Sequence, residues 1–191
     1  DGSIWEIKHN SGYGNESAFF ISTGPKSANV WIDGSVYGAT LLKGNPAYSR
    51  GLFAKVIDMK GDGALLILDN GQMLMIGSYD TFDTGWWFPP YPVLITEMNM
   101  WNLRKSKKVW VDEIMNSWEI FEETNLVGSI SGTVQQGRIF RTTSGSIYEV
   151  TGLTLQLVLE LQPSVMVLRN GSVYKLVVEG FDEPLICSKL K

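Results

Sequence analysis

Turn dipeptides recur between short apolar runs along the chain, and they constrain its fold more than any other feature. Asp33-Gly34, Asn70-Gly71 and Asn170-Gly171 each separate two apolar runs, and Ser144-Gly145 takes the same place in "GRIFRTTSGSIYEV". A two-residue type I′ turn needs positive φ at both central positions, so such dipeptides are strong hairpin signals. The sequence therefore predicts an antiparallel, all-β fold.

The register of each hairpin follows if the two turn residues are these dipeptides. Val30 is then expected opposite Tyr37, Val167 opposite Tyr174, and Arg141 opposite Tyr148. The hairpin around Asn70-Gly71 is apolar on both faces, a pattern typical of strands that are covered on two sides. We expect it to be the most buried of the hairpins.

Related phrases near the two ends of the chain suggest an internal repeat. "SIWEI" at 3–7 resembles "SIYEV" at 146–150, and "GSVY" occurs at 34–37 and at 171–174. The alternatives are duplication of a two-hairpin unit and convergent turn chemistry. If a two-hairpin unit was duplicated, Asp1-Gly2 is a turn whose leading strand is missing. Either the mature chain was cut at this turn, or the strand at 4–7 pairs elsewhere, and an unpaired edge there would allow oligomers to form.

Strand length and hairpin spacing favour tandem small barrels of the SH3-like kind, or a sandwich. Two stretches rich in turn formers, "GNPAYSRG" at 44–51 and "TNLVGSISG" at 124–132, are the expected linkers. The predicted modules are 1–48, 49–127 and 128–191. The last resembles the first, and the middle one carries an aromatic loop.

Two segments have patterns that a helix or a strand could explain. The stretch 109–123 spaces its apolar residues as an amphipathic helix does, which predicts at most one short helix there; two strands, "KVWV" and "SWEIF", are the alternative. In "TLQLVLEL" strict alternation places four leucines on one face, which favours a strand. These are Leu155, Leu157, Leu159 and Leu161.

Composition excludes several classes of function. With 44% hydrophobic and 19% charged residues the chain is an ordinary folded protein, and it has no apolar run near the ~18 residues of a membrane span. A net charge of -4 with scattered lysine and arginine argues against nucleic acid as a partner. The one cysteine, Cys187, is expected to be buried, and the one histidine, His9, lies in a polar turn. We expect no metal and no cofactor.

The stretch "GSYDTFDTGWWFPPYP" at 77–92 is the strongest candidate for a binding site. Large rigid rings beside carboxylates, on a backbone stiffened by prolines, can stack on sugars or extended peptides at low entropic cost. The alternative is that the loop folds inward and plugs a barrel. The predicted ligand-binding residues are Tyr79, Asp80, Phe82, Asp83, Trp86, Trp87, Phe88 and Tyr91.

These features favour a non-catalytic binding or assembly module that contacts a glycan, a peptide or a protein subunit through the aromatic loop. The alternatives are a small polysaccharide-acting hydrolase that uses Asp80 and Asp83, and a purely structural subunit. No catalytic residue is predicted. Seven Trp, seven Tyr, eight Phe and twenty Gly favour an exported or cell-surface protein, and a cytoplasmic location stays open.

Overall fold

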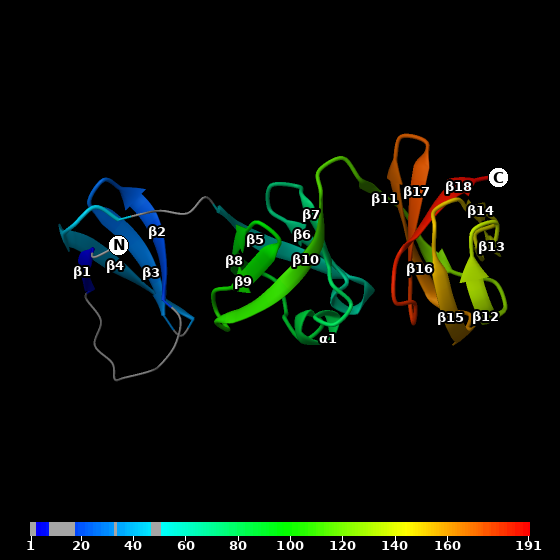
Figure 1. Ribbon diagram of the computed structural model, residues 1–191, viewed down its shortest axis with the longest axis horizontal. Coiled ribbons are helices and arrows are strands. Elements are labelled where there is room, and N and C mark those ends of the chain that lie inside the picture. The colour runs from blue at the N-terminus through cyan, green and yellow to red at the C-terminus, as the bar shows by residue number, and fades with distance from the viewer. Residues whose placement is uncertain (1–2, 8–17, 33, 47–50) are drawn as a thin grey trace.

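The computed structural model describes residues 3–7, 18–32, 34–46 and 51–191. Within these ranges the chain is all-β, as predicted, with one short α-helix and one 3₁₀ turn. Three β modules follow one another in a row from the N-terminus to the C-terminus (Figure 1). In the described ranges, no helix is both long and apolar enough to cross a membrane.

The first module is a four-stranded antiparallel sheet in the order β1-β4-β3-β2. Its strands are β1 (Ile4–Ile7), β2 (Phe19–Gly24), β3 (Ser27–Ile32) and β4 (Ser35–Lys43). Val30 pairs with Tyr37, which confirms the predicted register of this hairpin; Asp33 itself lies outside the described residues. The strand at 4–7 pairs with the second half of β4, the second of the two alternatives for it.

The second module is a closed barrel in the order β10-β7-β6-β5-β8-β9. Its strands are β5 (Leu52–Lys60), β6 (Leu65–Leu68), β7 (Met73–Ile76), β8 (Tyr91–Thr96), β9 (Asn99–Asn102) and β10 (Lys107–Met115). The 3₁₀ turn η1 (Gly61–Gly63) joins β5 to β6, and the helix α1 (Thr81–Thr84) lies between β7 and β8. The β6–β7 hairpin is buried on both faces, as predicted: Leu66 and Leu74 face the barrel core, whereas Leu65 and Met73 face the third module.

The third module is a six-stranded sheet in the order β11-β16-β17-β18-β14-β13, against which a two-stranded sheet packs. A bridge between Leu126 and Thr142 links the end of β11 to the segment after β13. The larger sheet contains β11 (Glu119–Asn125), β13 (Ile139–Arg141), β14 (Ile147–Val150), β16 (Ser164–Asn170), β17 (Val173–Val178) and β18 (Leu185–Lys189). The smaller one contains β12 (Ser129–Gln135) and β15 (Leu155–Leu161).

The helix predicted over 109–123 was wrong, because this stretch forms β10 and β11. The reason lies in two irregularities of the strands. The pairing of β10 with β7 shifts between Val111 and Glu113, and that of β11 with β16 shifts between Ile120 and Glu122. A bulge adds one residue to a strand, so it converts a period of two into the three- and four-residue spacings that resemble a helix. The short helix lies instead at 81–84, within the aromatic loop.

Two of the predicted hairpin registers were also wrong. Phe140, not Arg141, pairs with Tyr148, because the loop has three residues (143–145) and ends on Gly145 at φ +99°. A shift by one residue exchanges the two faces, so Phe140 and Tyr148 both enter the core. Tyr174 pairs with Arg169 rather than Val167, a shift by two that preserves the faces.

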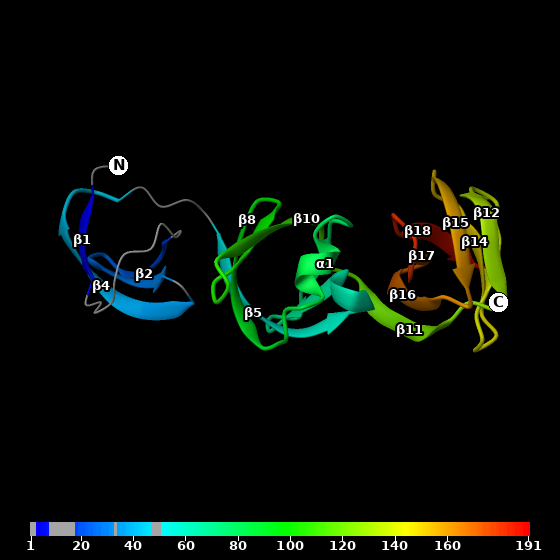
Figure 2. The same cartoon turned by 90° about the horizontal axis from the view of Figure 1, so that it is seen from below.

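The barrel and the third module share a continuous apolar contact. Methionines 73, 75 and 115 of the barrel pack against Met166 and Leu168 of β16. At the edge of this contact Lys175 pairs with Glu113 and lies over the Trp118 ring, 4.7 Å from its centroid. The two modules are therefore joined by packing as well as by the chain that connects them. Figure 2 shows the barrel and the third module next to each other.

Candidate functional site

The aromatic loop is anchored by two rings in the barrel core. Trp87 is 1% exposed and Tyr91 is 2% exposed, and their rings meet edge to face with centroids 5.8 Å apart. Burial raises the pKa of the Tyr91 hydroxyl, so this phenol stays neutral over the physiological range. Trp87 and Tyr91 therefore fold inward and fill the barrel, which is the alternative to a ligand-binding role for these two residues.

Close backbone packing fixes α1 on the 3₁₀ turn η1. The buried Thr84 hydroxyl donates to the Gly63 carbonyl over 2.9 Å. Gly63 has φ +97°, and a Cβ added there would collide with the backbone nitrogen of Gly85. Glycine at 63 therefore serves both a left-handed backbone and a close approach of two segments.

Polar contacts bind the loop to β10 and to the turn before it, and the two carboxylates of the loop make those with β10. The Asp80 carboxylate accepts a hydrogen bond from the backbone N–H of Trp110, and Asp83 pairs with Lys107 at 2.9 Å. Lys105 donates to the Trp86 carbonyl over 3.2 Å. Because both carboxylates have partners within the protein, each helps to position the rings beside it.

The remaining rings of the loop are exposed. Tyr79 is 100%, Phe82 77%, Trp86 62% and Phe88 75% exposed. Within the described part of the chain these four form no ring pair with one another, so their faces are available to a ligand. Exposed rings on a fixed backbone make this loop the candidate binding surface.

Sequence reasoning missed one exposed ring that neighbours this loop, Trp110 on β10. Its side chain is 50% exposed, and its Cδ1 atom would lie 3.4 Å from a Cβ on Gly77, at the start of the loop. We call these five exposed residues the aromatic patch: Tyr79, Phe82, Trp86, Phe88 and Trp110. Trp110 is 24 residues beyond Trp86, and only the pairing of β10 with β7 brings it to the loop.

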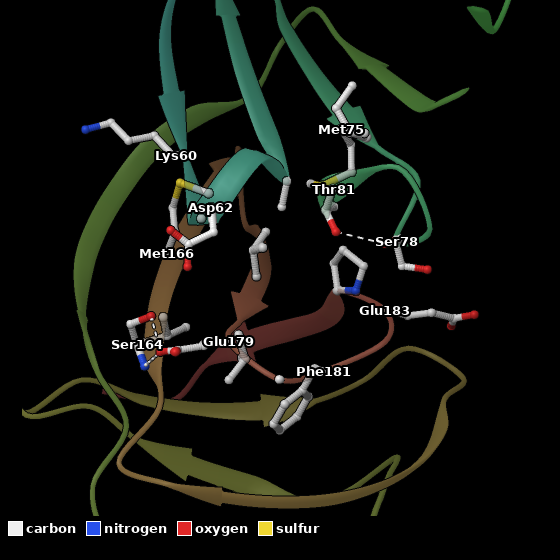
Figure 3. Close-up of a pocket in the computed structure, with 18 of the residues that line it drawn as sticks. Lys60, Asp62, Met75, Ser78, Thr81, Ser164, Met166, Glu179, Phe181 and Glu183 are labelled. Atoms are coloured by element: carbon white, nitrogen blue, oxygen red, sulfur yellow. Dashed lines mark hydrogen bonds between the residues drawn. The ribbon is translucent and has the colours of Figure 1, made fainter. Parts of the chain in front are cut away.

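A cavity lies between the barrel and the third module (Figure 3). The cavity measures about 330 Å³, and apolar side chains that include Met75, Met166 and Val177 line part of it. Asp62, Asp112, Glu123, Glu179, Asp182 and Glu183 also line it, which makes this cavity acidic. Its residues come from six separate stretches of the chain between Lys60 and Pro184, so no local pattern in the sequence predicts it.

Several polar groups at this cavity are already engaged. Lys60 pairs with Glu123 at 3.2 Å and with Asp58 at 3.6 Å, and the hydrogen bond to Glu123 raises the pKa of the lysine. The Ser164 hydroxyl donates to Glu179 over 2.9 Å, as Figure 3 shows. Of the two sites, the aromatic patch presents the more accessible surface for a large ligand.

Metal chemistry finds no support in the described ranges, where no group of three or more His, Cys, Asp or Glu side chains could hold an ion. Cys187 is buried, as predicted, and burial raises its thiol pKa to about 12. His9 lies outside the described residues. Comparisons of the chain with known protein families, with curated proteins and with solved structures gave no match.

Proposed function

We propose that this chain is a non-catalytic binding module, built from tandem SH3-like barrels, that contacts its ligand through the aromatic patch. The observation that carries this proposal is a contrast within one short segment. Trp87 and Tyr91 are buried anchors, whereas Tyr79, Phe82, Trp86 and Phe88 are exposed. A fixed backbone that presents open rings binds with little loss of conformational entropy.

The chemistry of the patch favours an extended glycan as the ligand. Ring faces stack on the apolar faces of sugars, and the exposed ion pair of Asp83 with Lys107 beside them offers both acceptors and donors to hydroxyl groups. A peptide or a protein subunit is the other ligand class that such rings can serve. An exported or cell-surface location fits this function and the richness of the chain in aromatic residues and glycine.

The alternative hydrolase function would need Asp80 and Asp83 as an acid and base pair. Their contacts with the Trp110 N–H and with Lys107 favour a positioning role instead. If the chain cleaves a polysaccharide, the double variant Asp80→Asn, Asp83→Asn should abolish turnover. If it only binds, no turnover is expected in the first place.

A glycan array followed by titration calorimetry tests the proposal. Trp86→Ala and Phe88→Ala should each weaken binding about tenfold, since loss of a stacking ring costs ~1.5 kcal/mol. Phe53→Ala is the matched control, because this ring is also exposed but lies on β5 outside the patch, beside Trp31. An equal loss of affinity in all three variants, or no loss of affinity in Trp86→Ala and Phe88→Ala, would contradict the proposal.

Binding of a peptide or protein subunit, with no glycan retained on the array, would identify the other ligand class. The same three variants then decide whether the patch is the contact surface.

A further inference from the structure

The two-stranded sheet of the third module has a buried inner face and an apolar outer face. Ile130, Val134 and Val158 point inward and are buried. The alternating leucines of β15 point the other way: Leu155, Leu157, Leu159 and Leu161 are 77–84% exposed, and Leu153, just before the strand, is 99% exposed. In the described chain nothing covers this face. Figure 2 shows β12 and β15 at the end of the molecule farthest from the first module.

The outer face consists of two unlike rows. Leu155, Leu157, Leu159 and Leu161 form the leucine row of β15. They pair with Gln135 at one end of β12 and then with Thr133, Ser131 and Ser129, and these last three are called the small-residue row. No residue of either row is ionisable. The leucines alone expose on the order of 600 Å², which reaches the upper range of the largest apolar patch on a typical monomer.

We propose that a second copy of this chain covers this face, so that the two outer faces pack against each other in a symmetric dimer. Closed two-fold pairs are the commonest assemblies of soluble chains, and their interfaces bring the same patch of each copy together. If the two-fold axis runs parallel to the strands, the leucine row of one copy lies over the small-residue row of the other. Thr133 of one copy then faces Leu157 of the second, at the ~10 Å spacing of packed sheets.

The chemistry of the face fits self-association. Large side chains that lie over small ones fill the space between two sheets. If leucine rows faced each other, the two small-residue rows would also face each other and leave unfilled space between them. No charge on one face meets a like charge on its copy. The leucine area of each copy approaches the ~800 Å² per partner of a standard interface before the small-residue row is added.

Charge also disfavours a lipid surface as the occupant. Membrane-surface segments combine an apolar face with a surplus of lysine and arginine. In residues 128–162, which contain both strands, Arg138 and Arg141 are balanced by Glu149 and Glu160. The segment therefore offers anionic lipids no net attraction, and a neutral, self-complementary face favours a second copy.

Sedimentation velocity of the whole chain at about 100 µM tests the dimer. The wild type should sediment with the mass of two chains. Leu157→Asp should sediment as a monomer with an unchanged far-UV circular dichroism spectrum, since it places two carboxylates in the dry interface but alters only an exposed position of each monomer. Leu42→Asp on β4, where the leucine is 62% exposed, is the matched control and should remain dimeric.

A crosslinking experiment gives a second readout that does not depend on a destabilising change. Thr133→Cys introduces a thiol that each copy exposes whenever the two separate, and the buried Cys187 does not compete for the reagent, so a short bis-maleimide should join two copies. Leu42→Cys should give no crosslinked pair. A wild-type chain that stays monomeric at this concentration, whether or not it binds lipid vesicles, would overturn the proposal. So would a dimer that survives Leu157→Asp.

Discussion

The adjacent tryptophans of the aromatic loop should respond in opposite ways to truncation. Trp87 is 1% exposed and packs in the barrel core, so Trp87→Ala removes ~200 Å² of buried ring at ~25 cal/mol per Å². The edge-to-face contact with Tyr91 is lost as well. Allowing for partial relaxation of the cavity, we expect a loss of ~4 kcal/mol in the free energy of unfolding. Trp86→Ala, at an exposed position, should change it by less than ~0.5 kcal/mol.

Urea unfolding followed by far-UV circular dichroism measures both variants on one scale. The midpoint should fall strongly for Trp87→Ala and hardly at all for Trp86→Ala. Iodide should quench the fluorescence of the wild type measurably more than that of Trp86→Ala, since an exposed indole has been removed. Similar losses of stability in the two variants would refute the assignment of one ring as an anchor and the other as a ligand contact.

Four further predictions concern the rest of the molecule. Glu122 is partly buried, which favours its neutral form, but hydrogen bonds from Ser144 and Tyr148 outweigh burial and lower its pKa. The ionised Glu122 carboxylate therefore stabilises the folded protein at pH values above the pKa that this group has in the unfolded chain. This stabilisation is lost as the pH falls through the lower pKa of the folded protein. Glu122→Gln should show a smaller drop in melting temperature between about pH 5 and pH 3 than the wild type. Cys187, with its pKa raised to about 12, should resist a thiol reagent in the native protein and react fully in urea; fast native labelling would contradict its burial. Lys107→Ala should cost less than ~1 kcal/mol, because its ion pair with Asp83 is exposed, and high salt should reduce even that difference in chemical denaturation. Gly63→Ala should lower the melting temperature far more than Gly71→Ala, since both glycines have positive φ but a Cβ meets nothing within 4 Å at Gly71.

The turn dipeptides of the sequence predicted the all-β class of the fold correctly. The errors in register and in the predicted helix came from loop lengths and bulges that differ by a single residue. Turn dipeptides identified the hairpins because glycine at positive φ is required wherever a tight turn closes. They could not distinguish a two-residue loop from a three-residue loop, and this one-residue difference moved Phe140 into the core beside Tyr148. Bulges at Val111/Glu113 and Ile120/Glu122 likewise produced the spacing that predicted a helix.

The candidate site shows the same division. Aromatic density indicated the loop, but nothing in "GWWFPPY" distinguishes a buried Trp87 from an exposed Trp86. Trp110 joins the patch only through strand pairing. In β15 the alternation predicted a strand correctly, yet its leucines face outward while Val158 faces the core. Hydrophobic periodicity shows that two faces differ, and only the tertiary structure shows which one is covered.

The central claim, that the aromatic patch binds a ligand, is tested most directly by the tryptophan side-chain N–H signals in a heteronuclear NMR titration. With a glycan retained on the array, the signals of Trp86 and Trp110 should shift and that of Trp87 should stay in place, with half-saturation at the calorimetric Kd. Shifts confined to the backbone amide signals of Met75 and Met166, in the cavity between the barrel and the third module, with the Trp86 signal unchanged, would contradict the claim.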